Sequence, residues 1–245
     1  PSRAGPGKTW SWVVAGLASA GLAAGAVPAE ERNIDLATDQ DVVRIDSRLD
    51  WDSFGYAMAT CDLNRDGVLD LLLSDSDTSG GGTRPASGEV YVIYGQRRAW
   101  QGPLRVPEDA DVVIYGEEHH DGLAALACGD VNGDTFADIV VCAPGGDGPA
   151  NDREEAGQAH LVFGSSSLPP VIDLAEDPGT IIYGEGEGLL LDGGAFCDSP
   201  AVADIDGDGI GDVIAEDREA PDMTGTLRRA GRIYVLFGRA TWPHQ

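Results

Sequence analysis

One acidic loop, repeated three times, constrains this chain more than any other feature. In the third copy, residues 203–217 read ADIDGDGIGDVIAED, with aspartates at positions 1, 3, 5 and 9 and Gly209 at position 6. Carboxylates this close repel each other by about 4 kcal/mol per close pair at an effective dielectric of about 20. The loop must therefore spread its side chains into water or wrap a cation. Oxygen ligands on a tight turn favour calcium over magnesium.

The same loop occurs twice more at a nearly constant spacing. Residues 61–75 read CDLNRDGVLDLLLSD, and residues 129–144 read GDVNGDTFADIVVCAP. The first positions of successive loops are 68 and 74 residues apart. A period of this size indicates one supersecondary unit per repeat.

Each loop offers side-chain oxygens at positions 1, 3, 5 and 9 and a backbone carbonyl at position 7. Asp, Asn and Gly also favour ordinary solvated turns. Because the same spacing recurs in all three loops, metal binding is the preferred interpretation. The predicted ligands are Asp62, Asn64, Asp66, Val68 and Asp70; Asp130, Asn132, Asp134, Phe136 and Asp138; and Asp204, Asp206, Asp208, Ile210 and Asp212.

These loops are not EF-hand loops, although they share the first half of that motif. An EF-hand needs a bidentate Glu at position 12 and a helix on each side. Position 12 is occupied here by Leu73, Val141 and Ala215. The residues after position 9 form apolar runs of strand length. We therefore expect each metal loop to be a turn between two strands.

Two further strands recur between the metal loops. Residues 88–95, 157–164 and 231–238 read GEVYVIYG, GQAHLVFG and GRIYVLFG, alternating large side chains and closing with Gly. DVVIYG at residues 111–116 and TIIYG at residues 180–184 follow as a fourth strand, and DVVRID near the N-terminus matches them. One unit is therefore four antiparallel strands in roughly 70 residues, without a helical pattern. Such units predict an all-β fold of propeller blades.

Together these motifs resemble the FG-GAP repeat of integrin alpha-chain β-propellers and their bacterial relatives. The family pattern joins Phe-Gly, the loop Gly-Asp-x-Asn-x-Asp-Gly-x-x-Asp-Leu, an apolar run ending Ala-Pro, and Gly-x-Val-Tyr-Val-x-x-Gly. The sequence departs from it at Thr135, which replaces the loop Gly, and at Asp121–Gly122 and Ala195–Phe196, which stand where Phe-Gly is expected. The stretches that carry the resemblance are Phe54–Gly55, Ala57–Asp70, Gly88–Gly95, Gly129–Pro144, Gly157–Gly164, Asp204–Asp212 and Gly231–Gly238.

The resemblance implies a β-propeller that binds about three Ca²⁺ ions, one in each loop, and that acts in extracellular adhesion or ligand recognition. In such propellers the metal loops lie on one face, and ligands usually meet the opposite face. The resemblance assigns that face to the inter-blade loops and to residues 74–87, 143–156 and 216–230.

The predicted domain boundaries follow the repeats. Residues 1–29 are expected to be a signal peptide, because a short basic start precedes an apolar run and the small-residue cleavage pattern AVPA. An uncleaved anchor helix is the alternative, although the run is short for a membrane span. Residues 30–50 are expected to be an outer strand that completes a blade. Residues 51–116, 117–184 and 185–245 are expected to be FG-GAP blades, the third incomplete.

Three blades are fewer than the seven of an integrin propeller. A closed ring of three would leave little central channel, and an open arc would expose strand edges. We therefore expect additional blades, as part of a larger ring. A homodimer that forms a two-chain, six-blade ring is the alternative.

Charge and missing motifs narrow the functional classes. The formal net charge is −26, which argues against nucleic acid and anionic membrane partners. The sequence has no nucleophile elbow, P-loop or dinucleotide-binding motif. We expect a non-enzymatic module, secreted or at the cell surface or in the periplasm, that binds a protein or glycan ligand and does not insert into membranes after signal removal. A secreted hydrolase with a propeller scaffold, or a purely structural segment of a large surface protein, is the alternative.

Four cysteines, Cys61, Cys128, Cys142 and Cys197, allow two disulfides in a secreted protein. Cys128 and Cys142 flank the same metal loop on adjacent strands, so they are the expected pair. Buried, unpaired packing near the propeller axis is the alternative.

Histidines offer a second metal interpretation, which we do not favour. Residues 117–121 read EEHHD, a composition that zinc could use, but an exposed inter-blade loop explains the run more simply. His160 falls on a strand and is expected to be a packing residue.

Overall fold

The computed structural model describes residue 36 and residues 42–48, 53–98, 100–185, 196–224, 226–227 and 229–243. The predicted signal peptide, residues 1–29, lies outside these residues. The chain divides into two units, residues 1–42 and residues 43–245, and all named strands belong to the second. In the described part of the chain, no helix has the length and hydrophobicity needed to cross a membrane.

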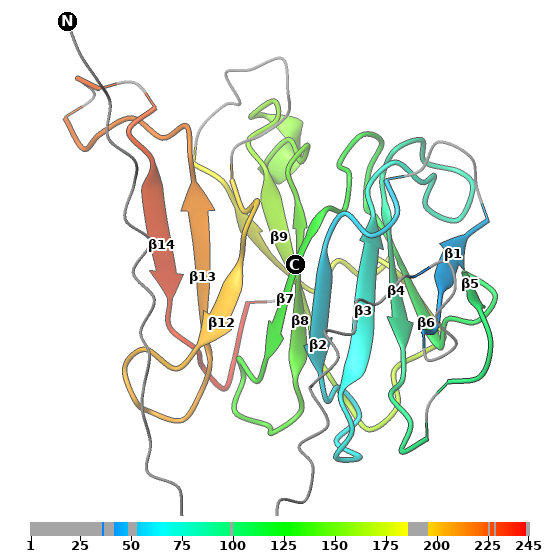
Figure 1. Ribbon diagram of the computed structural model, residues 1–245. Coiled ribbons are helices and arrows are strands. Elements are labelled where there is room, and N and C mark those ends of the chain that lie inside the picture. Colours follow the sequence, from blue (N-terminus) through cyan, green and yellow to red (C-terminus); the bar gives the residue numbers. More distant parts are fainter. Residues whose placement is uncertain are drawn as a thin grey trace, which may run out of the picture. The chain divides into compact units, whose positions relative to one another are not determined.

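The regular secondary structure of the second unit consists almost wholly of short β-strands (Figure 1). Its single helical element among the described residues is a 3-10 turn, η1 (Pro149–Asn151). The strands are β1 (Ile45–Ser47), β2 (Met58–Cys61), β3 (Asp70–Asp75), β4 (Glu89–Ile93), β5 (Leu104–Val106), β6 (Val112–Tyr115), β7 (Ala125–Gly129), β8 (Asp138–Ala143), β9 (Gln158–Val162), β10 (Val171–Asp173), β11 (Thr180–Tyr183), β12 (Ala201–Ala203), β13 (Asp212–Asp217) and β14 (Arg232–Leu236).

All the named strands except β1, β5 and β10 form three antiparallel groups, which we call blades, as the repeats predict. Blade 1 has the order β2-β3-β4-β6, and blade 2 has the order β7-β8-β9-β11. Blade 3 contains β12-β13-β14 and has no fourth strand among the described residues. The predicted all-β fold of antiparallel blades is therefore confirmed.

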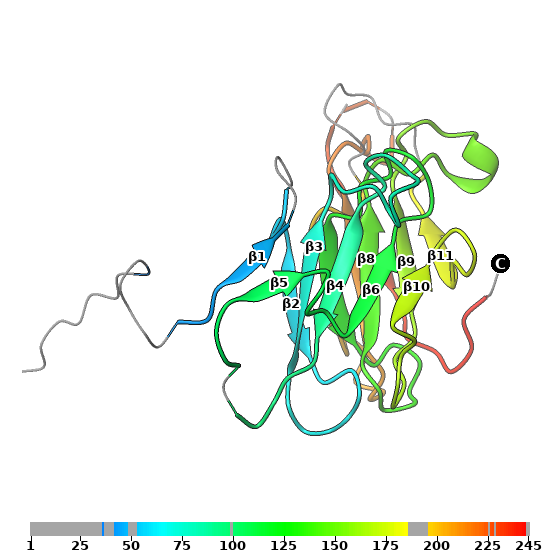
Figure 2. The same ribbon diagram turned by 90° about the vertical axis from the view of Figure 1, so that its right-hand side faces the viewer.

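Short parallel pairings join one blade to the next. β10 precedes the outer strand of blade 2 and pairs with the outer strand of blade 1, with Ile172 opposite Ile114. β5 precedes the outer strand of blade 1 and pairs in the same way with β1, with Leu104 opposite Ile45 (Figure 2). β1 lies within residues 30–50 and pairs with β5 as the outer strand of blade 1 pairs with β10. That it completes a blade stays a prediction.

Successive blades pack against each other through the alternating side chains of their strands. In β4, Val90 and Val92 lie in a buried cluster with Leu126 and Val141 of blade 2. Their neighbour Tyr91 belongs to a separate cluster on the other face of blade 1. A strand places successive side chains on opposite faces, so each strand contributes to two layers of the core.

Both disulfides run between blades, so the expected Cys128–Cys142 pair is wrong. The structure pairs Cys61 with Cys128 and Cys142 with Cys197. In the β7–β8 ladder Cys128 lies opposite Ile139 and Cys142 lies opposite Ala125, so the two cysteines are not cross-strand neighbours. Cys128 packs with the core shared with blade 1, and Cys142 with the core shared with blade 3. Each therefore bonds to the blade that it faces.

Loss of the first disulfide should destabilise the second unit. Cys61 and Cys128 are 67 residues apart, and closing a loop of this length lowers the entropy of the unfolded chain enough to stabilise the fold by about 4 kcal/mol. The double variant Cys61→Ser/Cys128→Ser should unfold at a lower urea concentration. Thr60→Ser, next to Cys61 on the same strand but leaving the bridge intact, is the control. An unchanged midpoint in the double variant would show that this bridge does not stabilise the fold.

Candidate metal centre

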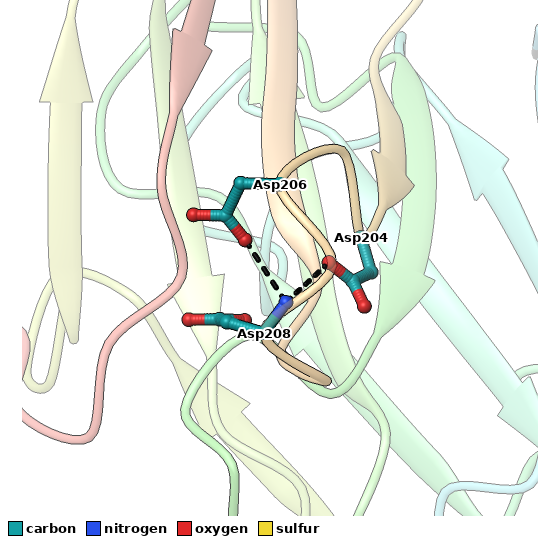
Figure 3. Close-up of side chains that lie close together, drawn as sticks. All are labelled: Asp204, Asp206 and Asp208. Atoms are coloured by element: carbon teal, nitrogen blue, oxygen red, sulfur yellow. Dashed lines mark hydrogen bonds between the residues drawn. The ribbon is translucent and has the colours of Figure 1, made fainter.

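The third acidic loop connects β12 to β13 and brings three carboxylates together. Asp204, Asp206 and Asp208 are exposed, and each offers an oxygen within 4.8 Å of the others (Figure 3). Carboxylate oxygens around a tight turn are the ligands that hard divalent cations prefer. The loop therefore supplies a donor set that fits such a cation.

Backbone amides of the loop hold these carboxylates in place. Asp204 accepts hydrogen bonds from the amides of Gly207 (2.6 Å) and Gly209 (2.9 Å) on its two different oxygens. The Asp208 amide donates to both Asp204 and Asp206, at 3.1 Å in each case (Figure 3). A carboxylate has about four lone-pair positions, so these bonds leave oxygen lone pairs for a cation.

The first two loops repeat this hydrogen-bond pattern. In every loop the position-6 amide donates to the position-1 carboxylate, the position-5 amide to the position-3 side chain, and the position-7 amide to the position-5 carboxylate. The structure therefore makes the three loops equivalent position by position. The acceptors are Asp62, Asn64 and Asp66; Asp130, Asn132 and Asp134; and Asp204, Asp206 and Asp208.

The position-9 aspartates, which the sequence predicts as metal ligands, also accept backbone hydrogen bonds that hold the blade together. The sequence analysis did not predict this second role. Asp70, Asp138 and Asp212 are buried, and each accepts two backbone amides. One amide belongs to position 2 of the same loop. The other belongs to the glycine that follows the third strand of the blade, Gly95, Gly164 or Gly238. Asp212 is not part of the group formed by the other three carboxylates of its loop.

The acidity of the position-9 carboxyls follows their surroundings. Burial raises the pKa of Asp138 to about 6 against the two backbone hydrogen bonds, and the charges of Asp134 and Asp130 add to the rise. Burial also raises the pKa of Asp70. In the third loop the amides of Gly238 and Ile205 dominate and lower the pKa of Asp212.

Backbone geometry separates the three loops further. Position 6 has a positive φ in each, 83° at Gly67, 79° at Thr135 and 90° at Gly209, which confirms that Thr135 occupies a conformation suited to glycine. Position 4 has the same property, and the sequence analysis did not single it out. Its φ is 61° at Arg65, 77° at Gly133 and 81° at Gly207. The third loop alone has glycine at both positions.

Comparison with known proteins agrees with this geometry. Residues 122–162, which span β7, the second acidic loop, β8 and β9, match the FG-GAP repeat family. The chain thus contains a segment that matches the FG-GAP repeat, and it is similar to integrin alpha chains. Integrin alpha-6 of Gallus gallus is 32% identical over 141 residues, which cover 56% of this chain and 11% of that protein. Integrin alpha-X of Homo sapiens is 34% identical over 118 residues, covering 45% of this chain and 9% of that protein.

A third relative aligns over a longer stretch, but the aligned stretch again covers only a small part of that relative. Integrin alpha-7 of Homo sapiens is 30% identical over 163 residues, covering 66% of this chain and 12% of that protein. The chain therefore spans about a tenth of the length of these curated relatives.

A polar cavity of about 270 Å³ lies at the ends of the blade-2 strands, away from the acidic loop. Asp121 is buried there, and burial raises its pKa to about 7. His160 is buried nearby, as the sequence predicted for a packing residue, and burial lowers its pKa to about 4. The cavity is lined by Glu117, Glu118, Asp121, Asp147, Gly148, Ala150, Asn151, Gln158 and Tyr183.

Residues 117–121 form an exposed loop apart from Asp121 and the half-buried Glu117. His119 and His120 are exposed. Within the described residues, the only grouping of three or more ligand-type side chains is that of the third acidic loop, so the structure assembles no zinc site here. The simpler interpretation, an inter-blade loop, is the one that the structure supports.

The position-9 carboxylate should stabilise the blade even without metal. Asp138→Ala leaves the amides of Val131 and Gly164 without their acceptor, at about 1–3 kcal/mol each. Urea unfolding in EDTA should therefore show a loss of about 2–6 kcal/mol. Asp134→Ala, at an exposed position of the same loop, is the control and should lose far less. Equal losses in the two variants would contradict a structural role for Asp138.

Asp121 should make the fold less stable as the pH rises. Its folded-state pKa of about 7 lies above the ordinary value of 3.8, so the folded protein holds this proton more tightly, and the resulting stabilisation is lost between about pH 4 and pH 7. Asp121→Asn removes this loss, and its melting temperature should rise relative to the wild type from pH 5 to pH 8.

The comparison of Asp121→Asn with the wild type must separate Asp121 from other groups that titrate. His160 has the opposite dependence, since its lowered pKa makes the folded state less stable below about pH 6.5, but it is present in both proteins. Glu154→Gln, at an exposed position whose charge does not contribute to the pKa shift of Asp121, is the control. A constant difference between Asp121→Asn and wild type at all pH values would refute the assignment.

Proposed function

We propose that this chain is part of a secreted or cell-surface β-propeller that binds Ca²⁺ in its three acidic loops and recognises a protein or glycan ligand on the opposite face. The observation that carries the proposal is the repeated loop, in which the same hydrogen-bond pattern recurs at positions 1 to 7 and three exposed carboxylates converge in the third copy. In this function the chain binds and does not catalyse.

Calcium is the cation that the donor set favours. Ca²⁺ accepts six to eight oxygen ligands at flexible angles, whereas Mg²⁺ demands a near-ideal octahedron and keeps several waters. The three loops offer only carboxylate, amide and carbonyl oxygens. We propose position 9 and the backbone carbonyl of position 7 as further ligands, with Asp212 able to use the lone pairs that its two backbone hydrogen bonds leave.

The two disulfides support an extracellular location for the chain. Two disulfides use all four cysteines, and such bonds persist in oxidising compartments. The names of the integrin alpha relatives point the same way. We propose that residues 1–29 direct the chain out of the cytoplasm, and that an acidic surface with a net charge of −26 keeps it away from nucleic acid and anionic lipid.

A secreted hydrolase remains the second candidate because of the polar cavity beside blade 2. Asp121 has a pKa of about 7, and Glu117 also has a raised pKa because of burial, as expected for a general acid. Release of reducing sugars from a panel of polysaccharides, abolished by both Glu117→Gln and Asp121→Asn, would establish this activity. Release that survives both substitutions would exclude the cavity as its source.

Calcium should stabilise the chain measurably. At about tenfold its dissociation constant, each site adds about 1.4 kcal/mol, so three sites add about 4 kcal/mol. Thermal melts in EDTA and in millimolar CaCl₂ should therefore differ by several degrees, with MgCl₂ as the control cation. Identical melting temperatures in EDTA and CaCl₂ would refute calcium binding.

The sites should differ in affinity in the order third, first, second. The third loop has four aspartates and glycine at both positive-φ positions, whereas the first has Asn64, Arg65 and a nearby guanidinium from Arg97. The second has Asn132 and keeps β-branched Thr135 at a φ of 79°, which costs about 1–3 kcal/mol. Calorimetry on single-site variants, with the other loops disabled by Asp→Ala at position 5, measures the order.

Thr135→Gly gives a sharper test of the second loop. Glycine removes the strain at the positive φ, so calcium affinity should rise by up to about tenfold. The matched substitution is Gly209→Thr in the third loop, which should weaken binding. If Thr135→Gly weakens calcium binding, the loop geometry proposed for the metal-bound state is wrong.

A further inference from the structure

The polar cavity at blade 2 contains a buried amide whose orientation is fixed by its neighbours. Gln158 is 4% exposed and lines the cavity, and its Nε2 lies 3.0 Å from Glu117 Oε2 and 3.1 Å from His160 Nε2. His160 Nδ1 lies 3.2 Å from the carbonyl oxygen of Pro178, which can only accept, so Nδ1 carries the proton. Burial lowers the pKa of His160 to about 4, so the ring is neutral and its Nε2 accepts from the amide.

The carbonyl oxygen of Gln158 is therefore an acceptor without a donor. Both amide hydrogens are used, one on Glu117 and one on His160. Within the described part of the chain, no group donates to Gln158 Oε1. A buried acceptor left unsatisfied costs about 1–3 kcal/mol. The cavity consequently favours an occupant that donates hydrogen bonds.

The four carboxyl groups of the cavity are each held by one oxygen only. One oxygen of each accepts an amide hydrogen bond, and the other accepts none from the described residues. The carboxylates thus combine a fixed position with an available oxygen. They belong to Glu117, Glu118, Asp121 and Asp147, and their donors are, in that order, Gln158 Nε2 (3.0 Å), Asn151 Nδ2 (2.8 Å), the backbone amide of Glu118 (2.9 Å) and the backbone amide of Glu155 (2.8 Å).

The charge of the cavity favours a cation over a neutral donor. Among the described residues that line it, four are acidic and none is arginine, lysine or histidine. Arg153 lies beside Gly148 of the wall, but its guanidinium donates to the carbonyl oxygen of Gly184. Burial raises the pKa of Asp121 to about 7, and the charges of the other three carboxylates add to the rise. A cavity lined by charges of one sign concentrates ions of the opposite sign.

The spacing of the acceptors selects the kind of cation. No three of these carboxylates offer oxygens within 4.8 Å of one another, so they do not form a metal site. A guanidinium pairs best with both oxygens of one carboxylate, and here one oxygen of each is already bonded. An ammonium donates three separate hydrogen bonds, which suits single oxygens on different side chains. The volume of about 270 Å³ is below the range of about 300–1,000 Å³ for drug-sized ligands, so it fits a small ion or one side chain.

We propose that this cavity binds a primary ammonium group, with Gln158 Oε1 and the available carboxylate oxygens of Glu117 and Asp121 as acceptors. The ammonium belongs either to a free diamine or to a lysine side chain of a protein ligand. The cavity lies beside η1, at the ends of the blade-2 strands opposite the second acidic loop (Figure 1). The inference rests on the proposed function, because it names a chemical group that the proposed ligand face binds.

Isothermal titration calorimetry of the full 245-residue chain with n-butylammonium tests the charge and shape of the site. At pH 8 Asp121 is ionised and an alkylamine is protonated. Butylammonium should bind, butylguanidinium should bind about tenfold more weakly or worse, and the neutral isostere 1-butanol should not bind. Absence of butylammonium binding overturns the inference. So does an equal affinity for butylguanidinium or for 1-butanol.

Two substitutions locate the site. Glu117→Gln and Asp121→Asn each keep the size of the side chain and remove one charged acceptor, so affinity for butylammonium should fall by about tenfold or more. Glu154→Gln makes the same charge change at an exposed residue that does not line the cavity, and it should bind as the wild type does. Thermal melts establish that each variant is folded, and Asp121→Asn decides if Glu117→Gln does not fold. An unchanged affinity in folded Asp121→Asn overturns the assignment.

Two further probes distinguish the sources of the ammonium group. 1,4-Diaminobutane represents a free diamine, and Nα-acetyl-lysine amide represents a lysine side chain. The tighter of the two identifies the source, and failure of both to bind overturns the proposal. Stabilisation by calcium, measured in the same protein, reports on the proposed function separately. A chain that calcium stabilises but that binds no ammonium probe refutes the cavity assignment alone.

Discussion

Each blade depends on one buried carboxylate with two backbone partners. The position-9 aspartate begins the second strand, accepts the amide at position 2 of its loop, and accepts the amide of the glycine after the third strand. It therefore ties the acidic loop, the second strand and the end of the third strand together at one point. A side chain at Gly164 would meet the Ala137 carbonyl oxygen at 2.0 Å, so the close approach requires glycine there. The loop that suits a cation and the closure of the blade thus share a residue.

The same carboxylate behaves differently according to its neighbours. Asp138 lies in the middle blade, where burial outweighs two hydrogen bonds and raises its pKa, whereas the amide bonds prevail for Asp212 in the blade with an exposed face. Equivalent positions in similar loops therefore do not have the same acidity. The packing of whole blades, which no single repeat encodes, sets the acidity of each site.

The sequence predicts the blades and the loops because both depend on local spacing. Alternation in GEVYVIYG and its copies specifies strands, and the 1-3-5 spacing places Asp204, Asp206 and Asp208 around one turn. The disulfides depend instead on which face of a blade each cysteine occupies. Cys128 and Cys142 are close in sequence but pack with different neighbouring blades. A prediction based on their closeness in sequence was therefore wrong. The second role of Asp138 also needed three dimensions, because its partner Gly164 is 26 residues away.

The two inter-blade disulfides affect how the blades unfold. In a protein built from stacked repeats, each unit contacts only its neighbours, and terminal units can open while the middle stays folded. Here the middle blade is bonded covalently to both sides, through Cys128 on one face and Cys142 on the other. When an end blade unfolds, the disulfide keeps it attached to the middle blade. The interface between the two blades can then re-form after closure of a short loop, which has a small entropic cost. The bonds thereby favour unfolding and refolding as one cooperative body over progressive fraying from the ends.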